Sequence, residues 1–248
     1  LILRDNVWGT LEEDAFRRDF TINALYYDPE TEEIVDYVGG LDDLENRRLR
    51  FIGHADVRLR EDPVRILRAI RFVAKLDFVL DPAIEAAIPE TAEQLAAIPP
   101  ARLFDEVCKL FLCGKAEAAW AFLAPTPLRS ALFPCTPPQD PFVRLAMRNT
   151  DARIAVDKPV TPGFLLAVIL WQDYLARYAE FAADHKPAEA RSSAAAGALG
   201  FQQEIISIPR RFSQFVRDVW SLQDRLERRQ PRSILRVYEH ARFRAAYD

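Results

Sequence analysis

From about residue 54 onward the sequence has the pattern of helices almost without interruption, and no other feature constrains the fold as strongly. After Asp62-Pro63, apolar residues recur at helical spacing: Val64, Leu67, Ile70 and Ala74. Aspartate is a good helix N-cap and proline suits the first helical position, so we expect a helix to open here with Asp62 as its cap. Only 8 glycines in 248 residues also favour helices over a β-sandwich.

The first 53 residues have a mixed pattern instead. Residues 20–27 and 33–38 are rich in strand formers and are separated by a turn signal at Asp28-Pro29-Glu30. A short helix is expected over 41–46 and a strand over 49–52. The sequence therefore predicts a mainly α protein with a small α/β segment at its N-terminus.

The remaining helices are expected between proline and glycine breaks. They are predicted over residues 82–88, 101–112, 116–123, 141–149, 162–181, 188–199, 209–229 and 231–247. Residues 124–140 hold five prolines and are predicted to connect two subdomains. The small, alanine-rich stretch 192–200 is predicted to be a loose helix end.

Charge is unevenly distributed along the chain. The formal net charge is −4, but residues 209–248 carry ten arginines against five acidic residues. A basic segment behind an acidic body suits contact with nucleic acid, because cationic side chains displace counterions from phosphates. A solvated helix face with an arginine bias is the alternative.

The three cysteines lack a CxxC pairing, and only three histidines are present. This argues against a disulfide framework and against a zinc site. The longest apolar run, 164–171, is too short to span a bilayer, and no signal peptide is visible. We therefore expect a cytoplasmic protein that does not enter a membrane.

The segment Arg17–Leu25 reads RRDFTINAL. Because strand residues alternate faces, Arg18 and Asp19 are predicted to point in opposite directions. From residue chemistry alone, a buried Arg–Asp network bracing a strand against a helix is the favoured alternative. The whole string, however, closely resembles a segment of the bacterial poly(A) polymerase and CCA-adding enzyme family of nucleotidyltransferases. The resemblance implies that Asp19 supports the catalytic carboxylates and that Arg18 contacts the triphosphate.

A second motif, EDPVR at residues 61–65, follows about forty residues later. A carboxylate at Asp62 could accept from the amino group of adenine or cytosine while Arg65 donates to the adjacent ring nitrogen. Guanine and uracil have the reverse polarity, so the pair should select A and C. The motif resembles the family's base-reading EDxxR. Arg68 and Arg71 continue at intervals of three and could assist on base or phosphates; an exposed salt bridge at a helix start is the alternative.

Further segments strengthen the resemblance. Asp36–Leu44 (DYVGGLDDL) resembles a family segment and is predicted to be structural. Residues 207–212, 217–220 and 238–248 resemble the body of bacterial poly(A) polymerases more than that of CCA-adding enzymes. The predicted RNA contacts are Arg210, Arg211, Arg217, Arg228, Arg229 and Arg232. The aromatic residues among them are predicted to be mostly core.

The resemblance implies three domains. Residues 1–53 would be the C-terminal part of a nucleotidyltransferase α/β head, 54–123 a helical neck with the base-reading motif, and 124–248 a helical body with a basic RNA-binding region. The family's glycine-rich turn and DxD carboxylates are missing before Leu1, which is not an initiator methionine. We therefore expect a fragment that holds no metal and is inactive alone.

The implied parent is a template-independent polynucleotide adenylyltransferase. It would use ATP and Mg²⁺, held in the complete head, to add AMP to RNA 3′ ends. One alternative is a CCA-adding tRNA nucleotidyltransferase, which shares both motifs. Another is a non-catalytic RNA-binding protein with a degenerate head. The sequence makes no prediction of oligomeric state.

Overall fold

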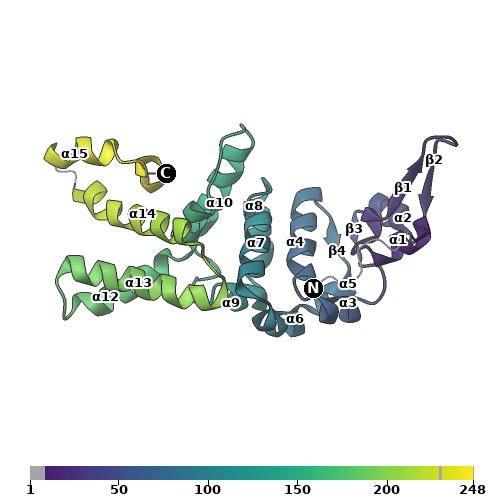
Figure 1. Ribbon diagram of the computed structural model, residues 1–248, viewed down its shortest axis with the longest axis horizontal. Coiled ribbons are helices and arrows are strands. Elements are labelled where there is room, and N and C mark those ends of the chain that lie inside the picture. The colour runs from purple at the N-terminus through teal and green to yellow at the C-terminus, as the bar shows by residue number, and fades with distance from the viewer. Residues whose placement is uncertain (1–8, 229–230, 248) are drawn as a thin grey trace. The chain divides into compact units, whose positions relative to one another are not determined.

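The computed structural model describes residues 9–228 and 231–247, with side chains described for 9–227 and 234–247. The chain forms two compact units, Leu1–Leu95 and Ala96–Asp248, and it is mainly helical, as predicted (Figure 1). Among the described residues, no helix combines the length and hydrophobicity that a membrane span requires.

The first unit mixes short helices with two small sheets. Its helices are α1 (Leu11–Arg17), a 3₁₀ turn η1 (Thr21–Asn23), α2 (Gly40–Glu45), α3 (Ala55–Glu61), α4 (Arg65–Leu76), α5 (Pro82–Ala86) and α6 (Ile88–Gln94). Its strands are β1 (Leu25–Asp28), β2 (Glu33–Asp36), β3 (Arg48–Leu49) and β4 (Val79–Leu80).

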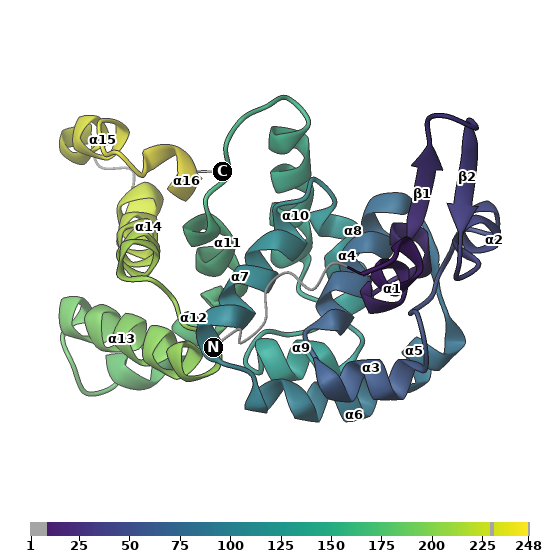
Figure 2. The same cartoon turned by 45° about the vertical axis from the view of Figure 1, so that its right-hand side comes forward.

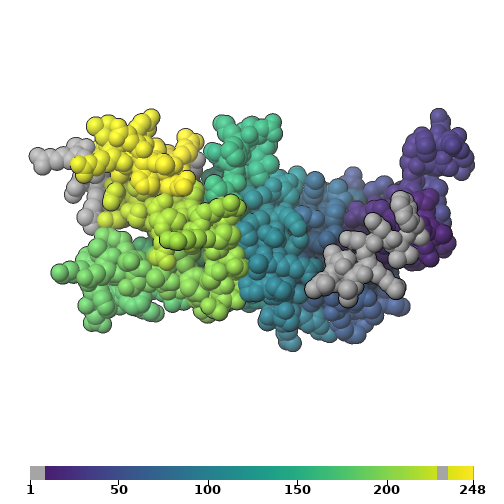
Figure 3. Space-filling model, in the orientation of Figure 1, coloured from purple at the N-terminus to yellow at the C-terminus, as the bar shows by residue number. Residues whose placement is uncertain are grey.

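Strands β1 and β2 form an antiparallel hairpin in which Leu25 pairs with Asp36 and Asp28 with Glu33. The hairpin stands out from the rest of the first unit in both ribbon views and in the space-filling view (Figures 1, 2 and 3). The first strand was predicted to start at residue 20, which is wrong. The Thr21 amide bonds to the Arg50 carbonyl (3.1 Å), and residues 21–23 then form the 3₁₀ turn before the strand begins.

A buried carboxylate, Asp43 of α2, ties three segments of the first unit together. Its side chain has no exposed surface and accepts hydrogen bonds from Thr21 Oγ1 (2.6 Å), Arg48 Nε (2.7 Å) and Arg50 Nε (2.8 Å). A buried charge is stable only when paired and hydrogen-bonded, and these three donors meet that need. Asp43 therefore fixes η1 and β3 against α2, which gives DYVGGLDDL a structural role.

Gly40, the first residue of α2, has no room for a side chain. A Cβ atom there would overlap the carbonyl oxygen of Thr21. We expect Gly40→Ala to lower the free energy of unfolding by about 1–3 kcal/mol, because backbone must move to relieve the overlap. Chemical denaturation of the chain measures this.

Gly200→Ala is the matched control for that substitution. Gly200 lies inside a helix with nothing near the added methyl group, so alanine should stabilise by about 0.5–1 kcal/mol. Equal effects of the two substitutions would contradict the packing argument.

The junction between α3 and α4 corrects the predicted helix start. Asp62 ends α3 with an extended backbone (φ −152°), and α4 begins only at Arg65, with Val64 as a cap that makes no side-chain hydrogen bond. The amides of Arg65, Ile66 and Leu67 bond to carbonyls three residues earlier (3.1, 3.2 and 3.0 Å), so a 3₁₀-type turn precedes the α-helix. Asp62 is therefore not the N-cap of α4.

In the part of the second unit that the structure describes, all regular secondary structure is helical. Its helices are α7 (Pro100–Phe111), α8 (Ala116–Leu123), α9 (Pro127–Leu132), α10 (Pro141–Ile154), α11 (Pro162–Ile169), α12 (Trp171–Ala182), α13 (Pro187–Ile205), α14 (Arg210–Arg228), α15 (Pro231–Tyr238) and α16 (Phe243–Tyr247). Helices α12 and α13 lie side by side (Figures 1 and 2).

Four predictions for this unit are wrong. The predicted helix 231–247 is two helices, α15 and α16, separated by a turn over residues 239–242. The proline-rich stretch 124–140 contains α9, whose Leu128 and Leu132 are fully buried, so it belongs to the core. The predicted helix 162–181 breaks at Leu170, between α11 and α12. Residues 192–200 lie inside α13 rather than at a loose end, because the alanines at its centre are buried against neighbouring helices.

The aromatic residues of α14 are mainly core, as predicted. Phe215 and Trp220 are 6% and 2% exposed. The indole N–H of Trp220 donates to the carbonyl of Ala167 in α11 (2.9 Å), and its ring stacks on Tyr174 of α12 at 4.5 Å. Of the α14 arginines whose side chains are described, Arg210, Arg211 and Arg225 are exposed and Arg217 is partly buried.

Candidate functional site

Asp19 lies at the centre of a cluster of arginines in the first unit. Its Oδ1 accepts from Arg65 Nε (2.9 Å) and lies 3.5 Å from Arg58 Nη2, while Oδ2 lies 2.8 Å from Arg68 Nη2. The Asp19, Arg58 and Arg65 side chains are only about one-seventh exposed. The fold thus brings predicted residues from both motifs, Asp19, Arg65 and Arg68, into direct contact.

Glu61 completes what we call the Asp19 cluster: Asp19, Arg58, Glu61, Arg65 and Arg68. Glu61 accepts 2.9 Å hydrogen bonds from Nη1 of Arg65 and of Arg58. The hydrogen bond from Arg65, and then the charge of Arg58, hold the pKa of Glu61 below its usual value. Three guanidinium groups against two carboxylates leave a net charge of +1, which favours an anionic ligand.

Two N–H donors of the Asp19 cluster are buried and have no hydrogen-bond acceptor among the described residues. The Nε atoms of Arg58 and Arg68 make no hydrogen bond within the described part of the chain. Arg65 commits Nε to Asp19 and Nη1 to Glu61 and the Arg58 carbonyl, the latter at 2.7 Å. Buried donors without acceptors are unfavourable, so a ligand with several oxygens would suit the cluster.

Arg18 joins a different network from Asp19, although the two residues do not alternate on a strand as predicted: Arg18 is the C-cap of α1, and Asp19 follows it in a bend. Its guanidinium bonds to Asp14 Oδ2 (2.8 and 3.0 Å) and to the Asn23 carbonyl (2.9 Å). Hydrogen bonds from the Tyr26 hydroxyl (2.7 Å), then from Arg18, lower the pKa of Asp14 well below its usual range. The backbone carbonyl of Arg18 accepts a hydrogen bond from Arg58 Nη2 of the Asp19 cluster (2.9 Å).

The predicted base-reading residues flank the turn between α3 and α4. The backbone N–H of Arg65 donates to the Asp62 carbonyl at 3.1 Å, which holds the two residues at the ends of one tight turn. Arg71, one helical turn beyond Arg68, lies over the ring of Phe72 at 5.4 Å. Among the described residues, no hydrogen bond or ion pair joins Arg71 to the Asp19 cluster.

Sequence reasoning missed Arg58 and Glu61 as site residues. Arg58 lies seven residues before Arg65, and Glu61 lies four residues before Arg65; these positions carry a signal, since such spacings place residues on one helical face. The break at Pro63 hid it, because a single continuous face does not cross a helix boundary. Tyr26, the partner of Asp14, carried no signal of its own.

The predicted RNA contacts fall on α14 and the residues that follow. Arg210 and Arg211 are exposed at its start, with Arg211 over the ring of Phe212 at 4.7 Å, and Arg217 is partly buried. Arg229 lies outside the described residues, as do the side chains of Arg228 and Arg232.

The described residues do not fit the implied Mg²⁺ site. Among them, no group of three or more His, Cys, Asp or Glu side chains could hold a metal ion. Both oxygens of Asp19 are engaged by guanidinium groups, whereas Mg²⁺ needs free oxygen ligands in octahedral geometry.

Comparison with known proteins supports the resemblance in the RRDFTINAL segment and in the arginine-rich C-terminal region. Three family models match the chain: "Poly A polymerase head domain" over residues 4–50, "Probable RNA and SrmB- binding site of polymerase A" over 77–138, and "Polymerase A arginine-rich C-terminus" over 183–248. The chain belongs to the bacterial poly(A) polymerase and CCA-adding enzyme family. The resemblance predicted from its sequence is thereby confirmed.

Members of both branches are similar to this chain. Poly(A) polymerase I of Escherichia coli is 40% identical over an alignment that spans all of this chain and 56% of that protein. The CCA-adding enzyme of Streptococcus sanguinis is 50% identical over 103 residues, or 42% of this chain and 26% of that one. The chain thus spans little more than half the length of its poly(A) polymerase relative.

The fold is that of known family structures. The crystal structure of the Bacillus stearothermophilus CCA-adding enzyme in complex with CTP matches 88% of this chain and 48% of that chain, with a TM-score of 0.57 and 28% identity.

Proposed function

We propose that the protein to which this chain belongs is a template-independent polynucleotide adenylyltransferase, adding AMP from ATP to RNA 3′ ends. The observation that carries the proposal is the alignment of poly(A) polymerase I along the whole chain. It covers the arginine-rich C-terminal region, and all three matching family models are named for that enzyme. A cytoplasmic location fits this activity.

In this proposal the turn at Asp62 reads the base. The Asp62 carboxylate accepts from the adenine amino group, and Arg65 donates to the ring nitrogen beside it. Asp19 and Glu61 hold the Arg65 guanidinium in place, which lowers the entropic cost of using it. Arg68, with Arg71, acts on base or phosphates, and Arg18 acts on the triphosphate.

The Mg²⁺ ions would be held by carboxylates of the complete head, outside the residues described. Mg²⁺ would activate the RNA 3′ hydroxyl and stabilise the departing pyrophosphate. The role implied for Asp19 beside those ions stays a prediction; its contacts support the further role of positioning Arg65 and Arg68.

A CCA-adding tRNA nucleotidyltransferase is the second candidate. It is favoured by the identity of 50% with the Streptococcus sanguinis enzyme, although over a shorter alignment. An Asp–Arg pair that accepts adenine also accepts cytosine, so the turn itself does not separate the two activities.

Primer extension by the full-length protein tests the proposal. We expect long tails from ATP, and little use of CTP, on both an unstructured RNA and a tRNA without its 3′ end. The 248-residue chain alone should add nothing, because its described residues form no metal site. Addition confined to the tRNA and dependent on CTP would assign the protein to the second candidate. RNA binding without any transfer would make it a non-catalytic binding protein.

A further inference from the structure

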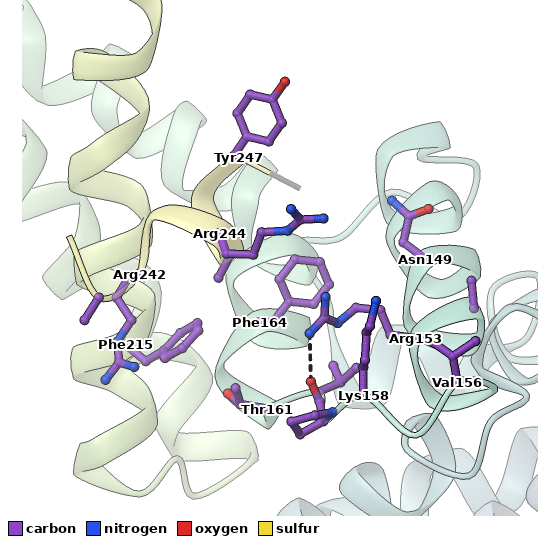
Figure 4. Close-up of a pocket in the computed structure, with 15 residues that line it drawn as sticks. Asn149, Arg153, Val156, Lys158, Thr161, Phe164, Phe215, Arg242, Arg244 and Tyr247 are labelled. Atoms are coloured by element: carbon purple, nitrogen blue, oxygen red, sulfur yellow. Dashed lines mark hydrogen bonds between the residues drawn. The ribbon is translucent and has the colours of Figure 1, made fainter. Parts of the chain in front are cut away.

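The second unit contains a cavity of about 670 Å³, and none of the predicted site residues whose side chains are described lines it. It lies among the end of α10, the loop that leads to α11, α14, and the segment of α16 (Figure 4). Its volume falls within the roughly 300–1,000 Å³ of ordinary ligand sites. Arg210, Arg211 and Arg217 are not among its lining residues, so it is distinct from the predicted RNA contacts.

The lining of the cavity is strongly basic. It includes four cationic side chains and, among the described residues, no aspartate or glutamate: Arg153, Lys158, Arg242 and Arg244. Arg244 extends from α16 toward the side where Arg153 and Lys158 lie (Figure 4). Arg242 has an acidic neighbour, Asp218, at 3.9 Å. Cations gathered around one hollow without lining carboxylates favour a polyanionic ligand.

The same lining offers aromatic surface. Phe164 and Phe215 form a buried wall, and Arg242 lies 4.6 Å from the centre of the Phe215 ring. Tyr247 is 70% exposed and borders the cavity from α16. An exposed aromatic ring beside cations is the combination on which single-stranded nucleic acid binds, with bases stacked and phosphates neutralised.

We propose that this cavity, which we call the α10–α16 pocket, binds a short stretch of single-stranded RNA. Lys158, Arg153 and Arg244 contact its phosphates, and Tyr247 stacks on a base. An acidic peptide would match the charge but would make no use of the exposed ring, so RNA is favoured. This inference depends on the proposed function in one respect, namely that RNA is the substrate.

Fluorescence anisotropy of a labelled oligoadenylate, titrated with the 248-residue chain over a range of salt concentrations, tests the proposal. For Lys158→Gln combined with Arg244→Gln we expect the Kd to rise on the order of 10-fold at low salt. The slope of log K against log salt should fall by about 0.7 for each phosphate that the variant no longer neutralises. Tyr247→Ala should weaken binding by about 5-fold or more while leaving that slope unchanged.

Lys186→Gln is the matched control, since Lys186 is an exposed cation of the same unit that does not line the pocket. Circular dichroism of each variant checks its folding, and Tyr247→Ala removes only an exposed side chain. Affinities and slopes equal to those of Lys186→Gln would overturn the proposal. Failure of the unsubstituted 248-residue chain to bind RNA would also overturn the proposal.

Two further results separate this inference from the proposed function. If binding depends on Arg210 and Arg211 but not on the pocket, the pocket is refuted while RNA remains the substrate. If oligoglutamate binds as tightly as oligoadenylate and loses the same affinity in the double variant, the pocket is a protein-binding site and the RNA assignment is wrong. Nucleotide addition by the full-length protein is judged separately from both results.

Discussion

Replacing Asp43 by alanine is expected to lower the free energy of unfolding of the first unit by about 3 kcal/mol. The substitution leaves the guanidinium groups of Arg48 and Arg50 without their shared carboxylate and leaves the Thr21 hydroxyl without its acceptor. Arg48 and Arg50 are 40% and 36% exposed, so both can turn partly toward water. The expected loss of unfolding free energy therefore lies at the lower end of the range measured when one partner of a buried ion pair is removed.

Amide hydrogen exchange of the first unit, in the 248-residue chain, measures this loss. The neighbouring Asp42→Ala is the control: Asp42 is 68% exposed and lies 3.4 Å from Arg48, so its loss should cost less than about 1 kcal/mol. Exchange in the second unit should be unchanged by either substitution. Similar effects at positions 42 and 43 would show that the buried carboxylate is not what holds these segments together.

Arg65→Ala, in the full-length protein, is expected to lower kcat/KM for ATP by about 10- to 100-fold. The loss corresponds to one or two polar groups of the base left unpaired, at about 1–3 kcal/mol each. Discrimination against GTP should fall as well, because the guanidinium is the donor that guanine cannot satisfy. Arg65→Lys should not restore either property, since an ammonium group cannot bond to Asp19, Glu61 and a base in the same planar arrangement.

The control for Arg65 is Arg60→Ala. Arg60 precedes the same turn, is 57% exposed, and forms surface pairs with Asp56 and Glu90. Its loss should leave nucleotide selectivity intact. If Arg65→Ala keeps the full preference for ATP over GTP, the turn does not read the base, and the roles proposed for Asp62 and Arg65 are wrong.

The local parts of the fold could be predicted from the sequence. Helical periodicity and proline positions indicated most of the helices, because both act within a few residues of the chain. The start of α4 was missed because a 3₁₀-type turn over residues 62–64 precedes it, which the Asp-Pro signal does not distinguish from the first turn of an α-helix. Helix α9 was missed because six residues are too few to show a clear helical period, and its two leucines, Leu128 and Leu132, are buried by residues distant in the sequence.

The candidate site could be predicted in its residues but not in its contacts. The motifs identified Asp19, Arg65 and Arg68, yet no pattern in the sequence indicated that Asp19 would bind the other two across 46 and 49 positions. Such pairing depends on how α4 packs beside the segment that follows α1. The α10–α16 pocket was missed for the same reason, because Lys158 and Arg244 meet only in the folded unit.

The environment of Asp43 restricts how this protein can evolve. A neutral residue at position 43 leaves the guanidinium groups of Arg48 and Arg50 without their carboxylate partner. A neutral residue at position 48 or 50 removes part of the positive charge that balances the buried Asp43 carboxylate. Each single step therefore passes through a less stable protein, whereas simultaneous replacement by apolar side chains avoids the unpaired charge. Among related sequences, positions 43, 48 and 50 should change together or not at all.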